Sequence, residues 1–187
     1  MLKYLSIFLA LALSSCSNGG ADESGPTTDQ PVTIFLVRHA EKDLEIAEDP
    51  PLTPVGEERA ELLGRLLADA GIATIFSSDT RRTLSTAAPL ANQLGLEPII
   101  YNPKQDPSDL LPIFLNARER GNILIVGHSN TIPATVNALL GEERYSNLDE
   151  STYDKVFVVH HWGMQEAAAY MLSVGAGNEK IPVGARN

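Results

Sequence analysis

Short, unbroken runs of apolar residues alternate along this chain with segments in which apolar residues recur at helical spacing. The runs at 32–37, 72–76 and 122–127 are rich in β-branched side chains, which is typical of strands buried on both faces of a parallel sheet. Helical spacing follows Thr53-Pro54 and again Ser77-Ser78-Asp79, and both segments carry side chains that suit the start of a helix. This alternation predicts an α/β fold with three layers, α/β/α, around a mostly parallel central sheet.

The rest of the folded part is predicted to hold one more short strand, two more helices and a C-terminal strand. These are a strand at 98–101, a helix at 108–120, a helix that ends at Gly141 and a strand at 155–160. Residues 165–174 are either the hairpin partner of that last strand, with the turn at Trp162-Gly163, or a short helix favoured by their alanines.

The first sixteen residues have the layout of a secretion signal. Lys3 provides a basic start, and residues 4–13 are mostly apolar but too short to span a bilayer. Small residues then precede Cys16. The segment 1–16 resembles a bacterial lipoprotein signal, which implies lipid on the Cys16 thiol and a lipid-anchored, periplasm-facing place in the cell envelope. A plain secretory signal with an incidental cysteine is the alternative.

The polar segment that follows separates this signal from the folded part. Residues 17–30 are mostly small, polar or acidic and have no apolar period, which predicts a disordered tether. We expect one domain at 31–175 and a loose tail at 176–187.

Composition limits the classes of partner and the covalent chemistry. The net charge of −10 disfavours binding to nucleic acid or to anionic membrane surfaces through bulk electrostatics. The single cysteine excludes an internal disulfide. In so acidic a chain, a local cluster of arginine and histidine stands out.

Polar signatures follow three of the predicted strands directly. The first strand ends in Arg38-His39, the second in Ser77-Ser78 shortly before Arg82, and the fourth leads into His128-Ser129-Asn130. Crossover connections bring the carboxyl ends of parallel strands to one edge of the sheet. Two arginines, two histidines and two helix N-termini at one point predict a site for a phosphoryl group. The sequence has no glycine-rich nucleotide loop.

A neutral histidine in such a pocket is also a nucleophile. We expect His39 to accept the phosphoryl group and water to attack the phosphohistidine. Arg38, Arg82 and His128 would hold the phosphoryl oxygens, the electrostatic contribution on which phosphoryl transfer mainly depends. The arginines supply the charge, so no metal and no cofactor is implied. His160 and His161 could suggest a metal site, but neighbours on a strand point to opposite faces and no Cys or Asp cluster is near, so structural or rim roles are expected.

Four segments resemble the histidine phosphatase superfamily, which has the phosphoglycerate mutase-like fold. They are residues 36–42 (Leu-Val-Arg-His-Ala-Glu-Lys), 52–56, 77–87 and 126–130. The resemblance implies that His39 is the phospho-accepting histidine and that the phosphate pocket consists of Arg38, Arg82 and His128. Arg81 does not match, and a surface salt bridge is the expected role for it.

The chain departs from that family in two places. Ala40 stands where glycine often follows the catalytic histidine, and Ser129-Asn130 stand where one branch has an acid that protonates the leaving group. Glu41 is a possible proton donor, but it is expected rather to pair with Lys42 or to cap the loop. Glu97 and Asp106 are weaker candidates.

These observations predict a phosphatase that acts on a small phosphorylated substrate. Protonation of a leaving oxygen is worth about 10²–10⁴-fold, so a missing acid favours labile phosphates. The small architecture resembles the phosphohistidine phosphatase-like branch, whereas an envelope location argues against cytoplasmic phosphorelay substrates. A lipoprotein that binds phosphate or a phosphoester with little or no turnover is the alternative, and a mutase is disfavoured because no substrate-enclosing insertion is evident.

Overall fold

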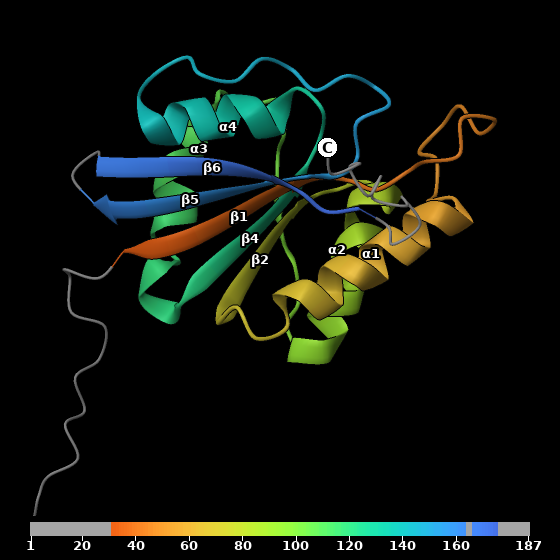
Figure 1. The fold of residues 1–187 in the computed structure, drawn as a ribbon, viewed down its shortest axis with the longest axis horizontal. Coiled ribbons are helices and arrows are strands. Elements are labelled where there is room, and N and C mark those ends of the chain that lie inside the picture. The colour runs from red at the N-terminus through yellow and green to blue at the C-terminus, as the bar shows by residue number, and fades with distance from the viewer. Residues whose placement is uncertain (1–30, 164–165, 176–187) are drawn as a thin grey trace, which may run out of the picture.

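A six-stranded sheet in the order β3-β2-β4-β1-β5-β6 runs through the middle of the structure, with helices on both faces (Figure 1). The computed structural model describes residues 31–163 and 166–175. The strands β3, β2, β4 and β1 are parallel, and β5 and β6 complete the sheet as antiparallel strands. The strands are β1 Val32–Arg38, β2 Ile72–Ser78, β3 Ile99–Tyr101, β4 Asn122–Gly127, β5 Lys155–Gly163 and β6 Glu166–Ser173.

The helices lie in pairs, one pair on each face. They are α1 Pro54–Leu67, α2 Arg81–Leu94, α3 Pro107–Leu115 and α4 Thr131–Leu140, with a 3₁₀ turn at Arg118–Arg120. In Figure 1, α1 and α2 cover one face of the sheet, and α3 and α4 cover the other. The predicted three-layer α/β/α architecture with a mostly parallel sheet is therefore confirmed.

Strand β4 shows why its sequence is apolar without alternation. Ile123 and Ile125 point into the core under α3 and α4, whereas Leu124 and Val126 point into the core above α1 and α2. All four side chains are fully buried. A central parallel strand covered by helices on both faces has no position left for a polar side chain.

The start of α2 differs from the sequence prediction. Ser77 and Ser78 belong to β2, where they pair with Ile100 and Tyr101 of β3 and are fully buried. The helix begins at Arg81, and the Thr80 side chain accepts a hydrogen bond from the backbone N–H of Thr83. Because Ser77 and Ser78 extend β2 in the parallel sheet, the helix cannot begin at these residues.

Two further boundaries also differ, and the alternatives for residues 165–174 are resolved in favour of the hairpin partner. Helix α3 ends at Leu115 rather than near residue 120, because Arg118–Arg120 offers no apolar side chain to the core and forms a 3₁₀ turn instead. Residues 166–173 are a strand despite their alanines, since pairing with β5 and packing of Ala167 and Ala169 against the core outweigh helix propensity. Trp162 and Gly163 belong to β5 rather than to the turn.

The segments predicted as signal peptide (1–16), tether (17–30) and tail (176–187) lie outside the described residues. Within the described residues, no helix is both long and apolar enough to cross a membrane. The lipid anchor therefore stays a prediction of the sequence.

The segment after β1 is held against the start of α1 by backbone contacts. The N–H of Thr53 donates to the carbonyl of Glu41 (2.8 Å), and the N–H of Asp43 donates to the carbonyl of Pro51 (2.9 Å). The Thr53 side chain caps α1 by accepting from the N–H of Gly56. A Cβ at Gly56 would lie 2.3 Å from the Glu41 carbonyl oxygen, so only glycine permits this close approach.

We therefore expect Gly56→Ala to lower the free energy of unfolding by about 1–3 kcal/mol, the usual cost of overpacking. Alanine in place of glycine otherwise stabilises a helix by up to about 1 kcal/mol, so the sign of the change is diagnostic. Urea unfolding measures it, with Glu58→Ala, an exposed site in the same helix, as the control that stays within about 0.5 kcal/mol. A Gly56→Ala protein as stable as the parent would contradict the close approach.

Candidate active site

The ends of β1, β2 and β4 bring the candidate residues to one edge of the sheet. Arg38 is the last residue of β1 and pairs with Gly127, the last residue of β4. The backbone N–H of His39 donates to the carbonyl of Gly127 at 2.9 Å, so the first signature lies beside the third. His128 follows at once, and its ring centroid lies 5.6 Å from that of His39.

His39 has the state that a nucleophile needs. Its side chain is almost fully buried, with 3% of the residue exposed. Nδ1 lies 2.8 Å from the carbonyl oxygen of Ala40, and a carbonyl only accepts, so Nδ1 carries the proton. Nε2 then presents a lone pair, and no described residue forms a hydrogen bond with it. Burial lowers the pKa of His39 to about 3. The hydrogen bond to the Ala40 carbonyl opposes this shift, and the positive charges of Arg38 and Arg82 add to it.

His128 is oriented from both sides. Its Nε2 lies 2.9 Å from the hydroxyl of Ser78, which is fully buried at the end of β2. Its backbone N–H donates to the hydroxyl of Thr131 at 3.0 Å. Burial first, and then the charges of Arg82, Arg38 and Lys42, lower the pKa of His128 to about 4. Both imidazoles are therefore neutral at physiological pH.

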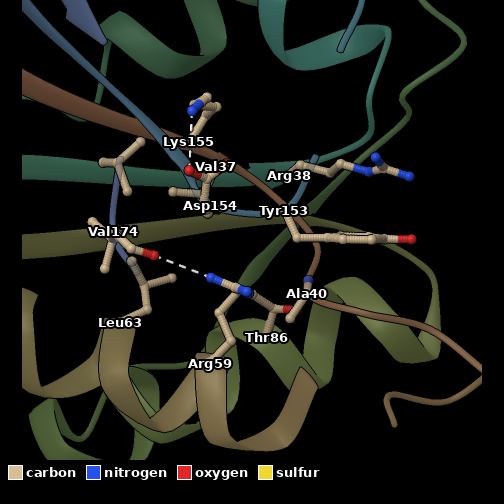
Figure 2. Close-up of a pocket in the computed structure, with 11 residues that line it drawn as sticks. Val37, Arg38, Ala40, Arg59, Leu63, Thr86, Tyr153, Asp154, Lys155 and Val174 are labelled. Atoms are coloured by element: carbon tan, nitrogen blue, oxygen red, sulfur yellow. Dashed lines mark hydrogen bonds and ion pairs between the residues drawn. The ribbon is translucent and has the colours of Figure 1, made fainter. Parts of the chain in front are cut away.

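Arg38 is buried and holds the segment that precedes β5. Its Nη1 donates to the carbonyls of Asp149 (2.8 Å), Glu150 (3.1 Å) and Thr152 (3.1 Å), and Nη2 donates to the Glu150 carboxylate at 2.8 Å. The guanidinium lies over the ring of Tyr153, 4.2 Å from its centroid, and Figure 2 shows the two side chains extended side by side. Its Nε is buried and has no hydrogen-bond partner among the described residues.

Arg82 comes to the site from the first turn of α2. Its positive charge contributes to the lowered pKa of both His39 and His128, which requires it to be near both rings. Its Nη1 lies 3.6 Å from a carboxylate oxygen of Asp49, and its Nε is buried without a partner in the described part of the chain. The salt bridge expected for Arg81 is thus made by Arg82, whereas Arg81 donates its backbone N–H to Asp49.

Glu41 is paired with Arg59 of α1 rather than with Lys42. The Arg59 guanidinium donates three hydrogen bonds of 2.7–2.9 Å to the Glu41 carboxylate and one to the carbonyl of Val174, the contact drawn in Figure 2. Burial raises the pKa of Glu41, but the hydrogen bonds and charge of Arg59 outweigh it and leave the pKa lowered. An ionised, ion-paired carboxylate is a poor proton donor.

The two weaker acid candidates have other surroundings. Asp106 is the N-cap of α3, and its carboxylate accepts from the N–H of Ser108 at 2.8 Å. Glu97 is exposed in the connection between α2 and β3. Neither makes a described contact with His39 or His128.

Glu150 is a carboxylate beside the site that sequence reasoning did not single out. It accepts from Arg38 Nη2 and, at 2.9 Å, from the Ser129 hydroxyl, while 72% of its side chain stays exposed. The Ser129 hydrogen bond, with the charge of Arg38, lowers the pKa of Glu150 despite partial desolvation. The sequence signal was weak, because Glu150 lies in a polar connection without any periodic pattern.

Thr86 and Tyr153 were also missed. The Thr86 hydroxyl accepts from the N–H of Ala40 at 2.9 Å and donates to the carbonyl of Arg82 at 2.7 Å, so it ties the residue after His39 to α2. The ring of Tyr153 lies 6.0 Å from that of His39. Helical spacing in 81–94 identified Thr86 as part of a helix but not as a link to the site.

The assembled geometry suits an oxyanion and a nucleophilic imidazole. The unpartnered Nε groups of Arg38 and Arg82 are donors that an oxyanion can satisfy. No group of three His, Cys, Asp or Glu side chains in the described ranges is placed to hold a metal ion.

Part of this chain matches a known protein family. Residues 34–104 match the model of the histidine phosphatase superfamily (branch 1). A protein of Yersinia enterocolitica named "Probable phosphoglycerate mutase GpmB" is 36% identical over 77 residues, which cover 38% of this chain and 35% of that protein. The chain therefore spans about a third of the length of this relative.

Solved structures share the fold over most of both chains. A protein of Agrobacterium tumefaciens assigned as the phosphohistidine phosphatase SixA has a TM-score of 0.60 and 20% identity, and the match covers 78% of this chain and 99% of that one. The mycobacterial glucosyl-3-phosphoglycerate phosphatase Rv2419c has a TM-score of 0.61 and 13% identity, over 78% and 100%. Residues 34–104, which include Arg38, His39 and Arg82, thus carry the sequence pattern of the histidine phosphatase superfamily, on the fold that these phosphatases share.

Proposed function

We propose that this protein is a metal-independent phosphatase that hydrolyses a small phosphorylated substrate through a phosphohistidine on His39. The observation that carries the proposal is the neutral imidazole of His39, whose Nε2 has no hydrogen-bond partner among the described residues, beside the buried guanidinium of Arg38 and the partly buried guanidinium of Arg82. A group that is neutral, oriented and surrounded by cations suits attack on a phosphate dianion.

The proposed reaction has two steps. In the first, Nε2 of His39 forms a bond to phosphorus as the bond to the leaving group breaks, and the leaving group departs with the bonding electrons. In the second, water attacks the phosphohistidine, the P–N bond breaks, and inorganic phosphate leaves with the neutral imidazole restored. Arg38, Arg82 and His128 hold the phosphoryl oxygens in both steps.

The leaving group receives little protonation in this site. The carboxylates of Glu41 and Glu150, bound by Arg59 and Arg38, both have a lowered pKa, and the carboxylate of Asp49 is ion-paired with Arg82. Substrates with a stable leaving group, such as phosphoramidates, acyl phosphates and aryl phosphates, therefore fit better than alkyl phosphates. The fold shared with a protein assigned as a phosphohistidine phosphatase is consistent with this class.

A protein that binds phosphate or a phosphoester with little turnover is the second candidate. The observation that favours it is the engagement of Arg38, whose Nη groups are already bonded to Asp149, Glu150 and Thr152. A mutase is disfavoured because no substrate-enclosing insertion is evident in the sequence. The envelope location suggested by Cys16 is an independent prediction, and the proposed chemistry does not require it.

His39→Asn is expected to abolish turnover of p-nitrophenyl phosphate, by at least about a thousandfold in kcat, because asparagine cannot accept the phosphoryl group. Steady-state assays without metal measure it, and mass spectrometry of the quenched parent should find phosphate on His39. The matched control is His160→Gln, which changes a histidine in β5 that bonds Thr33, and it should keep activity. Turnover that survives in His39→Asn would remove His39 from its role.

The lowered pKa values predict how the two imidazoles respond to pH. Between pH 7 and pH 5, His39 and His128 should take up no proton, because their pKa values are about 3 and about 4. In the unfolded chain both have the ordinary value near 6.5, so the unfolded state binds more protons as the pH falls below 6.5, and stability decreases. NMR of the imidazole carbons and urea unfolding over this range test both points. Titration of either ring near pH 6.5 would contradict the burial argument.

A leaving-group series separates the enzyme from the binding protein. As acetyl phosphate is replaced by an alkyl phosphate, kcat/KM is expected to fall, with about 10²–10⁴-fold of the loss due to the missing proton donor. The His39→Asn variant gives the background rate for each compound. Tight vanadate binding by the parent, with acetyl phosphate turnover no faster than that background, would support the binding protein instead.

A further inference from the structure

A hollow of about 360 Å³ opens beside the candidate active site. Seven residues of the segment 42–50, which begins three residues after His39, line it together with Arg82 of α2. Small-molecule sites have volumes in this range. Since Arg82 also acts electrostatically on both histidines, the hollow adjoins the place where the phosphoryl group would lie.

Some of the charged side chains that line this hollow have hydrogen-bond or ion-pair partners, and Lys42 differs from them. Asp43 accepts a hydrogen bond from the N–H of Glu45, and Asp49 accepts from Arg81 and lies near Arg82. Lys42 is partly buried, yet among the described residues its ammonium has no hydrogen bond or ion pair. Its charge reaches the site, because it contributes to the lowered pKa of His128 and of Glu150. A partly buried ammonium that forms no ion pair with any described residue is free to bind an anionic group of a ligand.

Apolar side chains of the same segment lie at the rim. Leu44 is 80% exposed and Ile46 is 42% exposed, and both line the hollow. Apolar side chains that gather at the rim of a polar hollow are one mark of a ligand-binding groove. The described lining of the hollow therefore combines the Lys42 ammonium, which has no ion pair there, with the paired charges of Asp49 and Arg82, the carboxylate of Asp43 and an apolar rim.

We propose that this hollow receives the leaving group of the substrate, and that this group carries a second anionic substituent, which pairs with Lys42, on an apolar body that packs against Leu44 and Ile46. The proposal rests on the proposed function, because it places the phosphoryl group between His39 and Arg82. It narrows the substrate class to phosphorylated compounds with a further negative charge, such as a carboxylate, on the leaving group. Lys42 is then a specificity-determining residue rather than part of the phosphoryl-transfer machinery.

The test compares phenyl phosphate with 4-carboxyphenyl phosphate on the full chain. Lys42→Met is expected to lower kcat/KM for the carboxylated ester about tenfold, the effect of losing one charge-assisted contact. It should leave kcat/KM for phenyl phosphate within about twofold. Because each variant is compared on both esters, the intrinsic reactivity of the two phenols cancels. Lys42→Arg should restore the preference, and Lys104→Met, at an exposed lysine after β3, should change neither value.

The outcomes are distinct. An equal loss on both esters would mean that Lys42 acts on the phosphoryl group itself and would overturn the subsite, as would no loss on either. Calorimetry gives the affinity of the two esters for His39→Asn and for the double variant with Lys42→Met, and so measures the contribution of Lys42 without turnover. If the parent protein hydrolyses neither these esters nor acetyl phosphate, the proposed function fails, while the binding comparison still shows whether Lys42 selects the carboxylated compound.

Discussion

A buried guanidinium at the end of a central strand is the constraint on which the site depends. Arg38 cannot lie inside the protein without partners, since an isolated buried charge is very unfavourable. Three backbone carbonyls, the Glu150 carboxylate and the ring of Tyr153 supply them. The segment that contains Asp149 and Glu150 has no regular secondary structure, so these contacts, together with the packing of Leu148 and its hydrogen bond to the carbonyl of Ser129, hold it in place.

The same cations keep the neighbouring imidazoles neutral. Burial and the charges of Arg38 and Arg82 all oppose protonation of His39. The consequence for stability is unfavourable at acidic pH, where the unfolded chain gains protons that the folded chain cannot bind. The consequence for chemistry is favourable, because the lone pair of Nε2 stays available over the whole physiological range. The buried, cation-flanked position of His39 thus lowers stability at acidic pH and at the same time keeps its imidazole ready to act as a nucleophile.

The carboxylates around the site show why the leaving group decides the substrate class. Glu41 is held by Arg59, and Glu150 is held by Arg38 and Ser129. Both pairings fix the position of a loop, and both favour the ionised form of the acid. A carboxylate that is ionised and paired can position a loop around the phosphoryl group, but it cannot donate a proton to the leaving group. In this site the pairing of both carboxylates favours the positioning role.

The sequence by itself determined the layers, the central strands and the candidate site residues, because these depend on local patterns. Burial on both faces requires unbroken apolar runs such as 122–127, and the polar residues that end such runs must lie at the edge of a parallel sheet. Only the tertiary structure decided which charges pair. Arg59 rather than Lys42 holds Glu41, and Arg82 rather than Arg81 lies near Asp49. Ser78 and Glu150 gained their contacts with the site in the same way. Such contacts join residues far apart in the chain, and their partners are chosen by the packing of α1, α2 and the segment before β5, which no local pattern encodes.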